Sequence, residues 1–344
     1  MGLLMDRQGI PITMSLHPGN TSEQSTAIPL EKEVLKMLEG AKFIYCADAG
    51  LGSYNIRKFN SMGGRAFIVT QSVKKLSDTL KEAVFNDFDY HLLSNDSPIT
   101  IGKMKTFDRF SKENLHLYND YAYKVIVADK AVDLGLYEEV TLRDGTVRSR
   151  KATGLLKQRL IITFSRKMME YQRIVRKGQI ERAQKLLDIK DPEEIKKGPN
   201  DVKRFMKRIS HTKSGEKAVI EYVLDKAKIT EEEKYDGYYA VATNLEDRVQ
   251  DILAISHKRY QIEECFRLMK TNFSGRPINH RLPNRIKAHF MICFTALLVY
   301  RLLEAKLDER YTHITPKNLI TTLKNMNVTN VHDIEYMAIY YGSK

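Results

Sequence analysis

The most constraining feature of the sequence is a regular alternation of strand-like and helix-like segments over its first 72 residues. Apolar extended runs on either side of the turn residues Asp6–Gly9 predict a β-hairpin. A short continuous apolar run such as Lys42–Ala47 is typical of a strand buried on both faces. The predicted order is β–β–α–β–α–β, with elements at Gly2–Met5, Ile10–Leu16, Ser22–Leu38, Lys42–Ala47, Ser53–Met62 and Ala66–Thr70. This order predicts an α/β layer in which Asp48 follows a central strand.

The chain changes character after this layer. Three extended pieces with turn signals are predicted, at Ala122–Ala128, Tyr137–Leu142 and Arg159–Phe164. A helical period then runs to Leu187. Aromatic and β-branched residues at 235–244 predict a returning strand. From Leu245 to about Lys270 the apolar residues recur with the spacing of an amphipathic helix.

Positive charge is concentrated in one segment of the chain. The sequence has 56 Lys and Arg against 43 Asp and Glu, a net charge of +13. The whole excess lies between Arg143 and Lys217, where 22 basic residues face 9 acidic ones. Such a basic stretch indicates a polyanionic partner, most often nucleic acid. A solvated helical face explains the charge equally well, so composition alone leaves both interpretations open.

Several classes of protein are excluded by what the chain lacks. Cys46, Cys265 and Cys293 lie far apart, which excludes a disulfide framework and a cysteine-based zinc site and fits a reducing cytoplasm. The histidines form no zinc-protease spacing. The longest apolar run, Phe290–Tyr300, is shorter than the about 20 residues needed to cross a bilayer. It predicts a buried helix and no membrane span.

A polar stripe lies on the predicted helix that ends near Lys270. Helical geometry places four charged side chains on one face, those of Arg259, Glu263, Arg267 and Lys270. Glu264 is turned about 100° away from Glu263 and is not equivalent to it. The stripe thus combines one carboxylate with three cations. Taken alone, it is also compatible with an exposed ladder of ion pairs, each contributing about 0.2–0.5 kcal/mol.

The stripe lies in the segment RYQIEECFRLMK, which is followed by RPINHRLPNRIKAHFMICFTALLVYRLLE and preceded, nearer the N-terminus, by GLLMDRQGIPITMSLHPGNTSE and FIYCADAGLGSYNI. These segments resemble bacterial insertion-sequence transposases of the DDE type, the first two resembling the catalytic segment of that family. Together they cover nearly the whole chain. The branch concerned has a tyrosine–arginine–glutamate–lysine signature, whose last three members match Arg259, Glu263 and Lys270. The signature tyrosine falls on Ser256, a departure that leaves one contact to a DNA end unmatched.

The resemblance implies a site at which carboxylates hold Mg²⁺ or Mn²⁺ for DNA strand cleavage and strand transfer. It makes Asp48, which stands in an A-D-x-G context, and Glu263 the catalytic and metal-holding residues. It makes three cations DNA-binding residues, namely Arg259, Arg267 and Lys270. The partners implied are transposon ends and target DNA, together with a second copy in a homodimer or a full-length transposase. The implied location is the cytoplasm, in association with the nucleoid.

One catalytic residue of the family has no counterpart in the printed sequence. In the family, the first catalytic aspartate closes a strand that precedes the hairpin at which this sequence begins. Asp6 lies in the hairpin turn and Asp236 in an Asp-Gly turn, so neither is expected to replace it. We therefore expect an N-terminally truncated chain that does not cleave DNA by itself. The alternatives are a non-catalytic DNA-binding remnant of a transposase and, with less support, a ribonuclease-H-type nuclease.

The expected architecture is α/β, a ribonuclease-H-like core lacking its first strand. Three domains are predicted. Residues 1–72 form the first part of the core, and residues 73–235 form an insertion that is β-rich and then basic and helical. Residues 236–344 complete the core and add C-terminal helices that carry the catalytic glutamate.

Overall fold

The computed structural model describes residues 1–37, 43–187, 201–211, 219–310, 314–331 and 335–339. The chain divides into two compact units. Unit 1 comprises residues 1–21 and 258–344, and unit 2 comprises residues 22–257. The three domains predicted from the sequence are a different division of the chain and stay a prediction.

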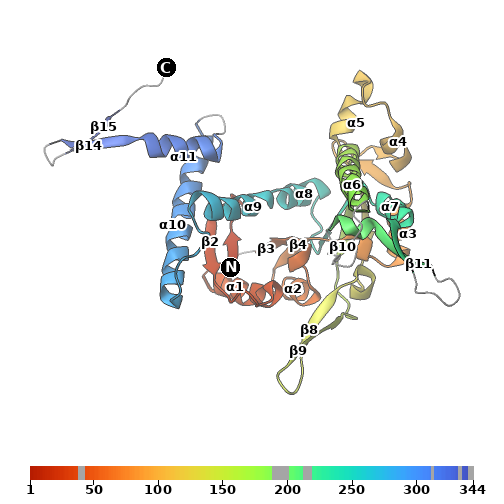
Figure 1. Ribbon diagram of the computed structural model, residues 1–344, viewed down its shortest axis with the longest axis horizontal. Helices are drawn as coiled ribbons and strands as arrows, with labels where there is room; N and C mark the ends of the chain where they lie inside the picture. The colour runs from red at the N-terminus through yellow and green to blue at the C-terminus, as the bar shows by residue number, and fades with distance from the viewer. Residues whose placement is uncertain (38–42, 188–200, 212–218, 311–313, 332–334, 340–344) are drawn as a thin grey trace. The chain divides into compact units, whose positions relative to one another are not determined.

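Unit 2 is built on a seven-stranded mixed sheet (Figure 1). In sheet order the strands are β3 (Ile44–Ala47), β4 (Ala66–Thr70), β13 (Tyr238–Thr243), β10 (Arg159–Phe164), β7 (Ala122–Val127), β5 (Tyr90–Leu92) and β6 (Pro98–Ile99). β3 and β4 are parallel, and the other neighbouring pairs are antiparallel. Because β7 and β10 come from the predicted insertion, that segment extends the sheet that contains β3 and β4. The mixed α/β class is confirmed.

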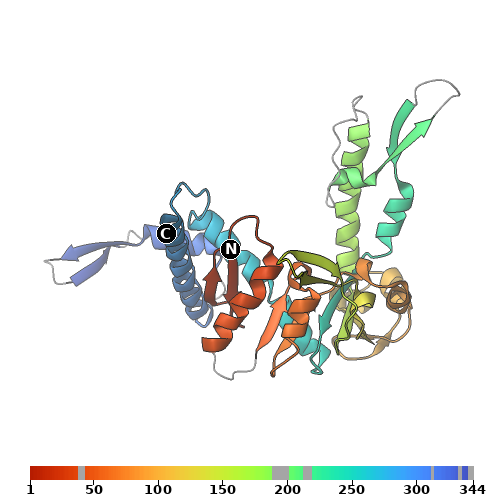
Figure 2. The ribbon, with the colours of Figure 1, turned by 90° about the horizontal axis from the view of Figure 1, so that it is seen from below.

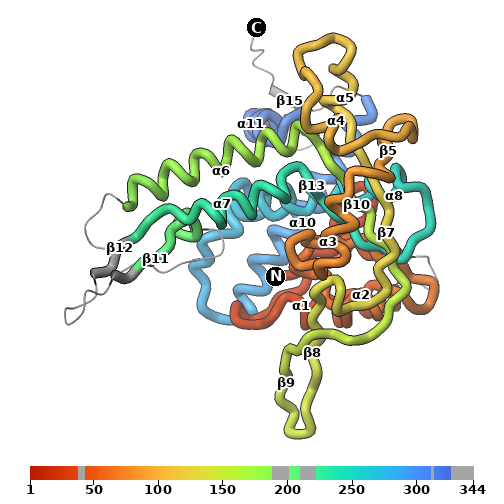
Figure 3. The backbone as a smooth tube through the Cα atoms, turned by 90° about the vertical axis from the view of Figure 1, so that its right-hand side faces the viewer, coloured from red at the N-terminus to blue at the C-terminus, as the bar shows by residue number. Residues whose placement is uncertain are grey.

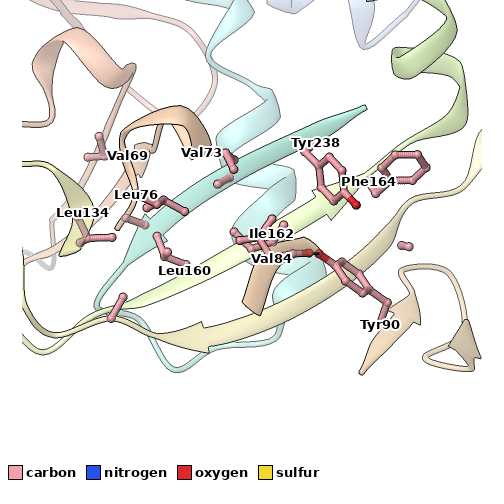
Figure 4. Close-up of a cluster of buried hydrophobic side chains, with 14 of the residues drawn as sticks. Val69, Val73, Leu76, Val84, Tyr90, Leu134, Leu160, Ile162, Phe164 and Tyr238 are labelled. Atoms are coloured by element: carbon pink, nitrogen blue, oxygen red, sulfur yellow. Dashed lines mark hydrogen bonds between the residues drawn. The ribbon is translucent and has the colours of Figure 1, made fainter. Parts of the chain in front are cut away.

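Both faces of the central strands are covered, which explains their continuous apolar runs. In β4, Ile68 packs on one face with residues of α8 (Val249–His257). Its neighbours Phe67 and Val69 belong to the larger cluster on the other face. Figure 4 shows part of that cluster, in which the Tyr90 hydroxyl donates a hydrogen bond to the Val84 carbonyl at 2.6 Å. Successive side chains of β4 thus point to opposite faces of the sheet and pack into two different hydrophobic cores.

Helices and short turns complete unit 2. The α-helices besides α8 are α1 (Glu23–Met37), α2 (Tyr54–Phe59), α3 (Asp78–Phe85), α4 (Ile101–Thr106), α5 (Leu115–Asn119), α6 (Arg166–Leu187) and α7 (Lys226–Glu233). The 3₁₀ turns are η1 (Ala49–Leu51), η2 (Val73–Lys75), η3 (Lys112–Asn114), η4 (Ala131–Leu134) and η5 (Val202–Phe205).

Two projections extend from the sheet of unit 2. One is a hairpin of β8 (Tyr137–Thr141) and β9 (Val147–Lys151), seen in Figures 1 and 3. The other is an arm made of α6, η5, α7 and the hairpin of β11 (Met206–His211) and β12 (Val219–Leu224), seen in Figure 2. The arm has a small core of its own around Ala183, Phe205 and Met206. Both projections come from the basic stretch of the sequence or its flanks.

Unit 1 joins the two ends of the sequence. Its elements are β1 (Gly2–Met5), β2 (Pro11–Ser15), α9 (Tyr260–Arg267), the π-helical turn η6 (Leu268–Asn272), α10 (Pro283–Asp308), α11 (Pro316–Asn325), β14 (Asn327–Val331) and β15 (Glu335–Ile339). The β1–β2 hairpin is the one predicted. Leu3 from this hairpin packs with Leu268 and Leu297 in the core of the unit.

The helix predicted from Leu245 to about Lys270 is interrupted. α8 ends at His257, and α9 begins at Tyr260 after a turn at Lys258 and Arg259. The apolar period continues across this turn, so the pattern of hydrophobic residues gives no signal for the break. The interruption coincides with the boundary between the two units.

The prediction of a buried helix at Phe290–Tyr300 is only partly correct. α10 is longer than that run and buries one face, which includes Leu297 and Tyr300. On the opposite face, Ile292 is 70% exposed and Val299 is 60% exposed. Among the described residues, α10 is the one helix long and apolar enough to cross a membrane. A single helix of this kind is weak support for a membrane protein, because core helices pass the same test.

Candidate active site

Asp48 directly follows β3, as predicted. The prediction that this strand is central is wrong, because β3 lies at the edge of the seven-stranded sheet. Oδ1 of Asp48 accepts hydrogen bonds from the backbone N–H groups of Gly50 at 2.9 Å and Leu51 at 3.2 Å, so the side chain caps η1. The residue is exposed, and no hydrogen bond or ion pair to Oδ2 is found in the described part of the chain. One carboxylate oxygen thus fixes the orientation of the group, and the other faces no competing protein donor.

Glu263 lies in α9 and is exposed. The predicted alternative for this helix was a ladder of ion pairs in which Glu263 and Arg267 are partners. Arg267 instead pairs with Glu264, its NH2 lying 3.2 Å from Oε1. Within the described residues, the Glu263 carboxylate forms no ion pair. The ladder is therefore not formed around Glu263.

Glu264 belongs to a separate, structural cluster. Its Oε2 lies 3.4 Å from NH1 of Arg301, a buried residue of α10. Arg301 also donates to the carbonyl of Gly9 at 3.1 Å and pairs with Glu304 at 2.5 Å. Arg301 therefore links the β1–β2 turn, α9 and α10, and this linkage holds the helix that carries Glu263. The sequence analysis missed Arg301, because two of its partners, Gly9 and Glu264, are distant along the chain and no local pattern indicates them.

The three predicted DNA-binding cations are distributed along the helical segment formed by α9 and η6. Arg259 is at the N-cap of α9, and Arg267 is its last residue. Lys270 is exposed and lies in the π-helical turn, with Nζ 5.9 Å from the centre of the Phe266 ring. The wider π turn alters the helical phase between Glu263 and Lys270, which a constant α-helical period does not predict. Turns of this kind occur often at functional sites.

Asp6 and Asp236, the two aspartates compared with the first catalytic aspartate of the family, have structural roles. Oδ1 of Asp6 accepts hydrogen bonds from the N–H groups of Gln8 and Ile10 and so closes the hairpin turn. Asp236 is 4% exposed and forms a two-point ion pair with Arg176, one of whose bonds measures 2.7 Å. A carboxylate held in this way is a poor candidate for a metal ligand. The prediction that both lie in turns is confirmed.

Asp48 belongs to unit 2 and Glu263 to unit 1, so each carboxylate is described within its own unit. In the described ranges, no three His, Cys, Asp or Glu side chains are grouped so that they could hold a metal ion. The convergence of Asp48 and Glu263 stays a prediction. Their donor chemistry fits the metal implied, because Mg²⁺ and Mn²⁺ prefer carboxylate oxygens and water as ligands.

The basic stretch divides into paired and exposed cations. Arg166 pairs with Glu170 at 2.7 Å, and Arg204 lies 3.3 Å from Glu232. The remaining exposed cations follow the β8–β9 hairpin and the outer surface of α6; among them are Arg143, Arg148, Lys151, Lys167, Lys177 and Lys185. The part of the stretch at 188–200 and 212–217 lies outside the described residues.

Comparison with protein families identifies the class. A family model of the transposase DDE domain matches residues 1–299. The chain therefore belongs to the transposase DDE domain family. A comparison with curated proteins finds no match. Membership of this family implies DNA binding.

Proposed function

We propose that Asp48 and Glu263 of this chain belong to one metal-dependent site that serves the DNA cleavage and strand transfer of a transposase. The observation that supports this most strongly is the match to the transposase DDE domain over residues 1–299. The match takes in both carboxylates and the three cations of α9 and η6. A ribonuclease-H-like arrangement of the core is part of the proposal. It is favoured by the parallel pair β3–β4, with a carboxylate at the end of β3.

Asp48 and Glu263 are the residues that would hold Mg²⁺ or Mn²⁺. When bound, the metal neutralises charge on the phosphodiester and makes a water or a DNA hydroxyl a stronger nucleophile. Asp48 is oriented by the N–H groups of Gly50 and Leu51, which leaves one oxygen for a ligand. Glu263 is exposed, and its helix is held through the Arg301 cluster. Both carboxylates are therefore available to a ligand without breaking an existing ion pair.

The cations have the complementary task of binding phosphates. Arg267 and Lys270 are exposed and follow Glu263 along α9 and η6, and phosphate contacts there would help to position a DNA strand. The exposed cations of the β8–β9 hairpin and α6 would add affinity without base specificity. Assembly with a second copy, on DNA ends, belongs to the same proposal.

The decisive experiment asks whether Asp48 and Glu263 share one metal site. Mn²⁺ binding to the full chain is measured by calorimetry for the wild type, Asp48→Asn, Glu263→Gln and the double variant. A shared site predicts that each single substitution weakens the same binding event and that their effects are not additive. The matched controls are the exposed carboxylates of α3, Asp78→Asn and Glu82→Gln, which should bind Mn²⁺ like the wild type. Independent, additive losses would refute a shared site.

DNA nicking separates the catalytic proposal from its alternative. Nicking of a DNA substrate that depends on Mg²⁺ and is lost in Asp48→Asn and Glu263→Gln supports a catalytic transposase. DNA binding without nicking in either metal favours the non-catalytic DNA-binding chain. A chain that neither binds metal nor binds DNA contradicts both.

A further inference from the structure

A small polar cavity lies in unit 2 beside the loop that carries Asp48. Its volume is about 70 Å³, several times the space of about 10–15 Å³ that one water requires. It is located where the parallel strands β3 and β4 end, the edge at which α/β sheets commonly bind ligands. The polar side chains that line it are Gln24, Ser53, Arg57, Thr70, Gln71, Ser72, Lys75 and Tyr137. Lys75 and Tyr137 are exposed, so the cavity opens to solvent.

Arg57 is the unusual member of this lining. Its side chain is 1% exposed, and it donates hydrogen bonds to the carbonyl of Gly52 at 2.9 Å and to the amide oxygens of Gln158 at 3.0 Å and Gln71 at 2.8 Å. All three acceptors are neutral, and no carboxylate pairs with Arg57 in the described part of the chain. Burial lowers the pKa of Arg57 to about 9, which still leaves it charged at neutral pH. A buried charge without a counter-ion is costly and calls for an anion.

The guanidinium retains donors for that anion. It has five N–H groups, and the three hydrogen bonds use three of them. Two further donors come from Ser53 and Ser72, which occupy the N-cap positions of α2 and η2. A serine at this position usually caps the helix with its hydroxyl, yet neither does so here. Their hydroxyls are therefore available to a ligand in the cavity.

The charge of the lining selects the class of ligand. Arg57 and Lys75 are the two charged residues of the lining, and both are cations. With no carboxylate in the lining, a metal ion or an amine has no favourable partner there. A compact oxyanion with several acceptor oxygens matches two cations and several hydroxyl and amide donors.

We propose that this cavity binds one phosphate group, held by Arg57 and Lys75 with the hydroxyls of Ser53 and Ser72. Ala49, which follows Asp48 directly, also lines the cavity, so a phosphate held here lies next to the Asp48 loop. The phosphate is either one linkage of a DNA strand or free inorganic phosphate. Only the assignment to DNA depends on the proposed function, because binding of phosphate itself requires no transposase activity.

The test begins with inorganic phosphate and the full chain. Sodium phosphate is titrated into the protein by calorimetry at constant ionic strength, with chloride as the balancing anion. Lys75→Gln should weaken phosphate binding by up to about fivefold, the upper end of the range for a solvent-facing charged contact. The matched control is Lys74→Gln, an adjacent exposed lysine outside the lining, whose phosphate affinity should not change. Ser72→Ala should also weaken binding while leaving the Tm unchanged, which separates loss of a ligand contact from misfolding of an Arg57 variant.

A second arm distinguishes the source of the phosphate. DNA binding is measured by fluorescence anisotropy without divalent metal, so failure of the proposed catalytic site does not affect the result. Competition between DNA and inorganic phosphate, with weaker DNA binding by Lys75→Gln than by Lys74→Gln, assigns the cavity to a DNA phosphate. Lys75-dependent phosphate binding with equal DNA affinities assigns it to free phosphate. Equal behaviour of both lysine variants toward both ligands overturns the proposal and leaves Arg57 as a purely structural link.

Discussion

The buried carboxyl group of Glu31 makes the stability of unit 2 depend on pH. Glu31 is 1% exposed in α1, where its Oε2 accepts a hydrogen bond from Nδ2 of Asn60 at 2.7 Å. Burial raises the pKa of Glu31 to about 7, although the bond from Asn60 and the charge of Arg65 oppose the shift. Among the described residues, Oε1 of Glu31 and Oδ1 of Asn60 are buried without a donor. Protonation turns the Glu31 carboxylate into a hydrogen-bond donor, which the two unpaired oxygens of Glu31 and Asn60 lack.

The direction of the pH dependence follows from the raised pKa. The usual pKa of Glu31 is 4.5 in the unfolded chain, so between pH 4.5 and about 7 the folded state binds more protons. The free energy of unfolding therefore has its full value below pH 4.5 and falls as the pH rises toward 7. A difference of about 2.5 pKa units corresponds to about 3 kcal/mol. Well above pH 7, Glu31 is ionised in both the folded and the unfolded state, so it no longer changes the free energy of unfolding with pH.

Glu31→Gln tests this reasoning because glutamine keeps the shape and donates a hydrogen bond at every pH. Urea unfolding, followed by circular dichroism at pH 5, 6, 7 and 8, gives the free energy of unfolding of each form. The wild type should lose about 2–3 kcal/mol more than Glu31→Gln between pH 5 and 8, slightly less than the full difference because pH 5 already lies above the unfolded pKa. Glu33→Gln, an exposed neighbour in α1, should follow the wild-type profile. Parallel profiles for the wild type and Glu31→Gln would refute the assignment of a buried, protonated Glu31.

Three further outcomes are expected. Arg176→Ala should lower the free energy of unfolding by about 3 kcal/mol in urea titrations, because it leaves Asp236 buried and Arg173, at 3.5 Å, compensates only in part. Gly237→Ala should cost about 2–4 kcal/mol in the same assay, because φ is +81° and a Cβ would lie 2.7 Å from the Phe164 ring. DNA affinity measured against salt should follow a log–log slope that flattens by up to about 3.6 when four exposed cations are reversed, at Arg148, Lys151, Lys177 and Lys185. An unchanged slope would assign these cations to solvation alone.

Local patterns in the sequence predicted most of the elements but not the way they are joined. The strands at Ala66–Thr70 and Arg159–Phe164 have the predicted limits, because continuous apolar runs bounded by turn residues leave few alternatives. The pairing of β10 with β13 and β7 brings together strands that are far apart in the chain. Periodicity carries no information on such long-range partners, so the order of strands in the sheet could not be predicted from the sequence.

In the candidate site, too, features set by neighbouring residues were predictable, and features set by distant residues were not. Asp48 was predictable because a strand, a carboxylate and glycine-rich turn residues follow one another in the sequence. Arg57 was not, since its acceptors on Gln71 and Gln158 lie 14 and 101 positions away and no motif marks a buried arginine. The cavity that Arg57 lines was equally hidden, because it depends on three loops meeting at one edge of the sheet.

For the neighbouring residues Glu263 and Glu264, helix geometry predicts the direction of each side chain but not the partners that it meets. Their helical phase, about 100° apart, was available from the sequence and predicts that they face different surroundings. The nature of those surroundings depends on Arg301, a residue 37 positions from Glu264. Because Arg301 and Arg267 both engage Glu264, Glu263 keeps its carboxylate outside the ion-pair cluster. The structural use of one glutamate is thus the physical reason that its neighbour stays available to a ligand.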